Sequence, residues 1–72
     1  MADGKIVRTN DSKGNQEEYR IYEDGDVYKV VNKGWLGFDD TITKVGTASS
    51  LQNGIELAQA DSGGKVDKIK DL

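Results

Sequence analysis

The sequence predicts an α+β domain: an antiparallel β-meander of three or four strands, with one helix packed on one face and a short C-terminal strand. Two observations predict the meander. Residues 17–31 hold two β-rich runs around Asp24-Gly25, and residues 41–46 alternate between the two sides of a strand. A third observation, the good helix formers of residues 56–60, predicts the helix. An all-β small barrel is the alternative.

The central hairpin decides which side chains face the core. A two-residue turn at Asp24-Gly25 would place three pairs on one face: Tyr22 opposite Val27, Arg20 opposite Lys29, and Glu18 opposite Val31. The other face carries only apolar or aromatic side chains: Tyr19, Ile21, Tyr28 and Val30. We therefore expect this second face to be the core side and the first face to be open to water.

Shorter runs on either side of the hairpin complete the expected sheet. Residues 5–9 are β-rich, and the turn formers of residues 10–16 join them to the hairpin, which indicates a second hairpin. Residues 41–46 predict a fourth strand, with Ile42 and Lys44 on one side of it. Residues 65–72 predict a short final strand, with a terminal helix as the alternative. We expect residues 1–72 to form one domain in which residues 1–4 are disordered.

Residues 49–60 allow either a helix or a hairpin. The helix places three apolar side chains on one stripe: Leu51, Ile55 and Ala58. It would begin at a capping box of Ser49 and Gln52, and Gly63-Gly64 would end it. In the hairpin, Asn53-Gly54 would be the turn, whereas in the helix an internal Gly54 costs about 1 kcal/mol relative to alanine. We favour the helix, and the hairpin stays open as the alternative.

The same segment carries a family resemblance. Asn53, Gly54 and Ile55 follow a β-rich meander, and in this they resemble the YegP-like family of small bacterial domains. In that family a meander precedes a helix with an Asn-Gly-Ile motif near its start. The resemblance implies a bacterial source and a meander with one helix, and it supplies no catalytic residue.

Size and composition exclude several classes of protein. A 72-residue domain is typically stable by roughly 3–5 kcal/mol. The chain has no cysteine and no histidine, so disulfides and the usual zinc sites are excluded. It contains no long apolar run and no signal peptide, so we expect no membrane partner and a cytoplasmic location. The net charge is −3 and no basic stripe is visible, so we do not expect nucleic-acid binding.

The residue types present do not predict an enzyme. Without histidine and cysteine, the familiar nucleophilic triads cannot form. The acidic residues near the hairpin turn and at residues 39–40 are interpreted as solvated charges, and their spacing does not match a calcium-binding loop. We therefore expect no catalytic residue, no metal site, no cofactor and no small-molecule substrate.

The loop GWLGF, residues 34–38, holds the only tryptophan and the only phenylalanine of the chain. We favour an interpretation in which Trp35 closes the core as a plug, because large apolar side chains are scarce elsewhere. The alternative is an exposed apolar patch, which would be the candidate interaction surface: Trp35, Tyr22, Val27 and Val31. The function expected is a non-catalytic protein-interaction module that contacts another protein or a second copy. The alternative is an acidic decoy that binds a basic site on a nucleic-acid-handling protein.

Overall fold

The computed structural model describes residues 4–32 and 41–72, and in these residues five strands form one antiparallel sheet. The elements follow in the order β1 (Gly4–Asn10), β2 (Gln16–Tyr22), β3 (Asp26–Asn32), β4 (Thr41–Thr47), α1 (Leu51–Ser62) and β5 (Lys65–Asp71). In space the strand order is β4-β3-β2-β1-β5. The α+β prediction is confirmed, including the meander, the single helix on one face and the C-terminal strand.

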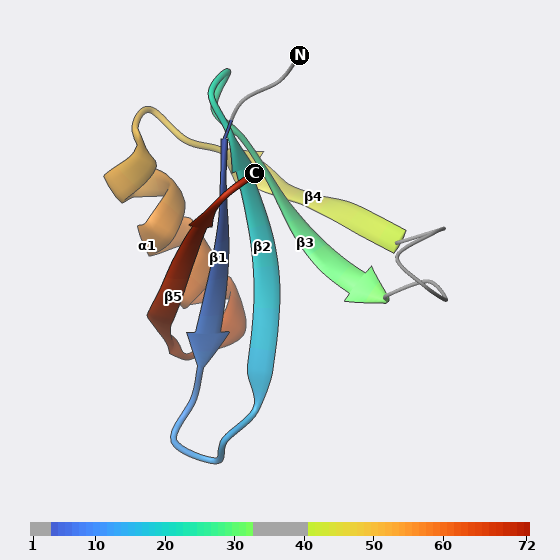
Figure 1. Ribbon diagram of the computed structural model, residues 1–72, viewed down its shortest axis with the longest axis vertical. Coiled ribbons are helices and arrows are strands. Elements are labelled where there is room, and N and C mark those ends of the chain that lie inside the picture. Colours follow the sequence, from blue (N-terminus) through green and yellow to red (C-terminus); the bar gives the residue numbers. More distant parts are fainter. Residues whose placement is uncertain (1–3, 33–40) are drawn as a thin grey trace.

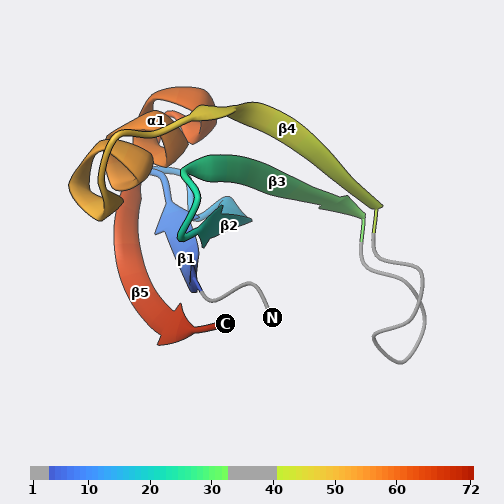
Figure 2. The same cartoon turned by 90° about the horizontal axis from the view of Figure 1, so that it is seen from above.

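The helix and the curvature of the sheet give the two faces different surroundings. α1 crosses from the β4 edge to the β5 edge, and the sheet curls around it so that α1 lies on the concave face (Figure 1, Figure 2). The buried core lies between α1 and this face: Val7, Tyr19, Ile21, Val27, Ala48 and Ala58. No described element covers the opposite, convex face (Figure 2).

The turn between β2 and β3 has three residues, so the predicted register of this hairpin is wrong by one position. Ile21 lies opposite Val27, and Arg20 lies opposite Tyr28. Gly25 adopts φ 102°, and its N–H donates to the Tyr22 carbonyl at 3.0 Å. An Asp-Gly pair fits a type I turn closed by a glycine bulge as well as it fits a two-residue turn.

A shift of one residue exchanges the two faces of a strand. Val27, expected on the open face, is fully buried, and Tyr28, expected in the core, lies on the convex face. Lys29 takes the core side opposite Tyr19. Its ammonium nitrogen lies 3.7 Å from a Glu17 carboxylate oxygen, so the long side chain reaches a partner near the surface.

The helix begins one residue later than predicted. Ser50 is the N-cap: its hydroxyl accepts a hydrogen bond from the Asn53 N–H at 3.1 Å. The Asn53 side chain reaches back and accepts from the Ser49 N–H at 3.0 Å, so Asn53 takes the part predicted for Gln52. At the other end, Gly63 has φ 73° and donates to the Gln59 carbonyl at 2.9 Å, which confirms the predicted stop.

Gly54 brings the helix close to the sheet. A Cβ built at this position would lie 2.8 Å from Cγ2 of Ile21, so an alanine would not fit without a shift. Ala58 is fully buried on the same side of the helix, and Ile55 packs against the core, as predicted. Leu51, predicted on the same stripe, is instead 42% exposed, because it lies at the open end of the helix.

Tyr19 and Asp61 join β2 to the last turn of α1. Tyr19 is fully buried, and its hydroxyl donates to a carboxylate oxygen of Asp61 at 2.7 Å. The ammonium group of Lys29 lies 4.0 Å from the same carboxylate oxygen. Burial, and then the hydrogen bond to Asp61, raise the pKa of Tyr19 above its ordinary range.

Two predictions concern segments at the limits of the described residues: the N-terminus and the tryptophan loop. Residues 1–3 and the loop of residues 33–40, with Trp35, lie outside the described residues. Gly4, predicted to be disordered, is the first residue of β1, and its carbonyl accepts a hydrogen bond from the Leu72 N–H at 3.0 Å.

Within the described residues, no helix has the length and apolar character needed to cross a membrane.

Candidate interaction surfaces

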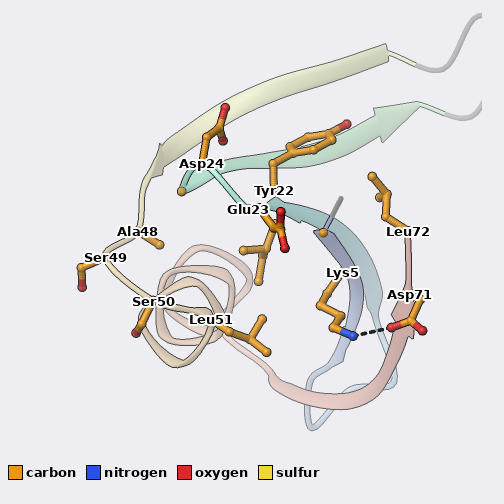
Figure 3. A pocket seen from close by; sticks show the side chains of 13 residues that line it. Lys5, Tyr22, Glu23, Asp24, Ala48, Ser49, Ser50, Leu51, Asp71 and Leu72 are labelled. Carbon is orange, nitrogen blue, oxygen red and sulfur yellow. Dashed lines mark hydrogen bonds and ion pairs between the residues drawn. The ribbon is translucent and has the colours of Figure 1, made fainter. Parts of the chain in front are cut away.

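A hollow of about 640 Å³ opens at the end of the molecule where α1 begins (Figure 3). Four segments line it: the start of β1, the end of β2 with the β2–β3 turn, residues 48–51 and the C-terminal residues 71–72. Leu51 and Lys5 lie on opposite sides of this space (Figure 3). The hollow has the size of a ligand pocket, but its side chains must also supply polar groups that fix a ligand.

The charged groups of the hollow are largely matched to one another. The Lys5 ammonium donates to a carboxylate oxygen of Asp71 across the rim. This hydrogen bond and the charge of Lys5 hold the pKa of Asp71 below its ordinary value. Asp71 is exposed, so water screens the ion pair. The hollow is therefore a surface feature with a neutralised lysine, and it does not single out a ligand.

The convex face presents two tyrosines from the middle of the sheet. Tyr22 and Tyr28 pack edge to face, with ring centroids 5.6 Å apart and ring planes at 82°. Both side chains are half-buried. Gly4 lies opposite Tyr22 on β1, which leaves no side chain there to cover the ring. The pair is an aromatic feature that the predicted register would have divided between two faces.

The convex face is also basic, although the chain is acidic overall. The register places six of the ten basic residues on it: Arg8, Arg20, Lys44, Lys65, Lys68 and Lys70. Two of the thirteen acidic residues share it, Glu18 and Asp26. This face therefore carries a formal charge of about +4, although the chain has a net charge of −3. Side-chain alternation along the strands produces this excess.

The outer half of the β3–β4 hairpin extends beyond the helix as an arm, which we define as residues 30–32 and 41–44 (Figure 2). Val31 is 56% exposed and Ile42 is 37% exposed. β4 is an edge strand of the sheet, so one side of its backbone has no strand beside it among the described residues. The arm therefore combines exposed apolar side chains with unpaired backbone groups.

Among the described residues of the predicted patch of Trp35, Tyr22, Val27 and Val31, Val27 does not lie on the surface. Val27 is in the core, which corrects its assignment to the surface, and the cause is the shifted hairpin register. Tyr22 is on the convex face, as expected, and Val31 is exposed on the arm. Trp35 lies outside the described residues.

The distribution of charge along the chain does not reveal the basic face. Lys68 and Lys70 lie beside Ile6 and Arg8 only because β5 pairs with β1. The signal that could have found them is the alternation of Lys68, Ile69 and Lys70, once the partner of that strand is known.

Comparisons with family models, curated proteins and solved structures found no match to this chain. The resemblance of Asn53-Gly54-Ile55 to the YegP-like family therefore stays a prediction. Among the described residues, no group of three or more acidic side chains is placed to hold a metal ion. The surface features above are thus the basis for a functional proposal.

Proposed function

We propose that this protein is a small non-catalytic protein-interaction module that takes its partner at the free edge of β4. The observation that carries the proposal is the contrast between the two edge strands of the sheet. β4 has one charged residue in seven, Lys44, and five β-branched residues. β5 has five charged residues in seven. Charged side chains on an edge discourage the addition of another strand, so β5 is protected and β4 is open to a partner.

The partner that suits this edge is an extended protein strand. Strand addition gains affinity from backbone hydrogen bonds and specificity from alternate side chains. Thr41, Ile42 and Thr43 are all exposed and favour the extended conformation. A second copy of the chain offers the same strand, and two antiparallel copies of β4 would make a symmetric contact. Self-association is therefore the first form of the interaction to test.

The second candidate, an acidic decoy, has less support. It needs the acidic residues of the central hairpin to form one surface. Glu17 lies 3.7 Å from Lys29 on the concave side, whereas Asp26 lies 3.2 Å from Lys44 on the convex side. The acids are thus divided between faces and partly matched by lysines, so no acidic surface favours this alternative.

Sedimentation velocity over a wide range of protein concentration tests the module. We expect the wild type to form dimers, and Ile42→Lys to remain monomeric because a lysine on an edge strand opposes pairing. Ile69→Lys is the matched control, since Ile69 is an exposed isoleucine on the other edge strand, 48% accessible. Circular dichroism checks that both variants are folded.

Two results would count against the proposal. One is a wild type that stays monomeric and also fails to bind a synthetic peptide of residues 41–47. The other is a loss of association in Ile69→Lys as large as that in Ile42→Lys, because the contact would then not depend on the β4 edge.

A further inference from the structure

The convex face combines aromatic rings with positive charge, and we propose that it binds single-stranded nucleic acid. This inference does not rest on the β4 edge, and it names a different class of partner. It reverses the expectation drawn from the charge count along the chain, because the strands place on one face the cations that the sequence distributes over several segments.

The positive charge is concentrated where β5, β1 and β2 lie side by side. Arg8, Lys68 and Lys70 line a shallow hollow of about 80 Å³, together with Ile6 and Glu18. None of the three cations forms an ion pair with any described residue. Like charges held this close repel one another, and an anion bound between them relieves that repulsion.

The order of the strands places the rings between two sets of cations. Lys68, Lys70 and Arg8 lie on β5 and β1, and Tyr22 and Tyr28 follow on β2 and β3. Lys44 comes last on β4, where its ammonium group also lies 3.2 Å from Asp26. In an edge-to-face pair, one ring presents its edge to the other, so both faces of that ring stay clear of its partner. A strand that crosses the sheet could stack a base on a tyrosine and place its phosphates near the cations on either side.

The positive charge of the convex face suits any polyanion, and the two tyrosine rings favour one class of polyanion over the others. An acidic polypeptide would satisfy the cations, but it offers no planar face to stack on the tyrosines. A nucleic-acid duplex supplies phosphates, but its bases stack on one another, so the tyrosine rings cannot stack on them. Unpaired bases with a charged backbone supply both features, and aromatic rings on an open sheet are a known way to hold them.

The net charge of the chain does not prevent this contact. At physiological ionic strength the Debye length is about 8 Å, so charges on the concave side are screened from a ligand on the convex side. Contacts with nearby cations then dominate over the overall charge of −3. At lower salt the attraction to these cations and the repulsion from the more distant acidic residues both grow, and the attraction dominates because the cations are nearer.

Fluorescence anisotropy of a labelled oligothymidylate of about eight nucleotides measures the binding, since an open sheet of this kind holds a few nucleotides. We expect the affinity to fall as salt rises. Lys68→Gln and Lys70→Gln should each reduce the slope of log affinity against log salt by about 0.7, the value for one phosphate contact on a single strand. Lys13→Gln removes the same charge from the exposed β1–β2 turn and should leave the slope unchanged.

The stacking step has its own matched pair of variants. Tyr28→Leu removes the ring but keeps an apolar side chain, and it should weaken binding at least about fivefold, because one base loses its stacking partner. Tyr28→Phe keeps the ring and should bind like the wild type. Circular dichroism confirms the fold of each variant before its affinity is compared.

Several outcomes would overturn the proposal. One is a wild type that does not bind the oligonucleotide even at low salt. Another is a Lys13→Gln variant that lowers the salt slope as much as Lys70→Gln does. Tighter binding of a duplex than of the single strand would contradict the role of unpaired bases. Equal binding of polyglutamate, with no effect of Tyr28→Leu, would identify an acidic polypeptide as the partner. Sedimentation without oligonucleotide measures self-association at the β4 edge. The proposed function and the nucleic-acid proposal are therefore tested independently.

Discussion

At the residue scale, the Tyr19 hydroxyl is a polar group inside the core. It is fully buried and has one acceptor, the Asp61 carboxylate. Tyr19→Phe keeps the ring and removes this hydrogen bond. A hydrogen bond to a charged group contributes about 1.5–3 kcal/mol, and part of this loss is recovered because Asp61 keeps Lys29 nearby. We expect the free energy of unfolding to fall by about 1–2 kcal/mol at neutral pH, as measured by urea denaturation.

The same hydroxyl predicts a pH dependence in the alkaline range. The pKa of Tyr19 is raised in the folded protein by burial and by Asp61, so the folded state holds its proton more tightly than the unfolded chain. This contribution is fully present below the pKa of an unfolded tyrosine, about 10, and it declines at higher pH by about 1.4 kcal/mol per pH unit.

Tyr19→Phe supplies the control for this titration, because the two proteins share every other titratable group. The difference in unfolding free energy between wild type and Tyr19→Phe should be constant from neutral pH to about pH 9 and should shrink above about pH 10. A difference that stays constant in the alkaline range would contradict the raised pKa.

The absence of a Cβ atom at Gly54 lets helix α1 pack closely against Ile21 of β2. Alanine is the better helix former by about 1 kcal/mol, but its Cβ would lie 2.8 Å from the buried Ile21 side chain. Overpacking of a core costs about 1–3 kcal/mol, so we expect Gly54→Ala to lower stability by about 1 kcal/mol on balance. In the double variant with Ile21→Val, the cost of Gly54→Ala should be smaller, since Val lacks the Cδ1 atom 3.0 Å from the built Cβ. Equal costs in both backgrounds would rule out this contact.

At the element scale, Gly25 holds the three-residue β2–β3 turn in place. Its carbonyl accepts from the Ala48 N–H at 2.7 Å, and a Cβ at Gly25 would lie 2.5 Å from the Ala48 carbonyl oxygen. Gly14 has a similar positive φ of 83°, but a Cβ there would meet nothing within 4 Å. Both glycines therefore have a positive φ, and they differ in how closely other atoms pack around them.

This difference makes a matched test. Gly14→Ala should cost about 1–2 kcal/mol, the penalty of a left-handed conformation for a residue with a Cβ. Gly25→Ala should cost about 2 kcal/mol more, because it also forces the turn away from Ala48. Urea denaturation of the two variants gives both numbers. Equal destabilisation would show that the contact with Ala48 has little energetic effect.

The type and order of most elements could be predicted from local patterns. β-rich runs, Gly63 at the helix end and the helix formers of residues 56–60 each acted through neighbours in sequence. The hairpin register could not be predicted in this way, because Asp24-Gly25 is compatible with two turn lengths. Tertiary packing decided it: Val27 fills the core under α1, and Lys29 reaches Glu17 and Asp61.

The candidate surfaces were less predictable than the elements for the same physical reason. Side-chain alternation predicts that Tyr22 and Val31 lie on an open face, and in the structure Tyr22 lies on the convex face and Val31 is exposed. The tyrosine pair depends on the register, and the basic face depends on the pairing of β5 with β1. Contacts between distant segments leave no local pattern in the sequence.

At the scale of the whole molecule, the sheet is completed by segments from the two ends of the chain. Lys5 of β1 and Asp71 of β5 are 66 positions apart in sequence, and they are partners in the register. The hairpins of β1 to β4 join near neighbours, whereas β5 reaches its place only after the chain has crossed the sheet through α1. Long loops must close before such a contact forms.

The late position of β5 has a consequence for the order of folding. We expect the β1–β2 and β2–β3 hairpins to belong to the folding nucleus, and β5 to dock after the rate-limiting step. Val66→Ala, in β5, should then speed unfolding and leave the refolding rate nearly unchanged, whereas Val30→Ala, in the β2–β3 hairpin, should slow refolding. Stopped-flow measurements in urea separate the two. Until β5 docks, β1 is itself an unprotected edge, so a newly made chain carries two open edges where the finished molecule keeps one.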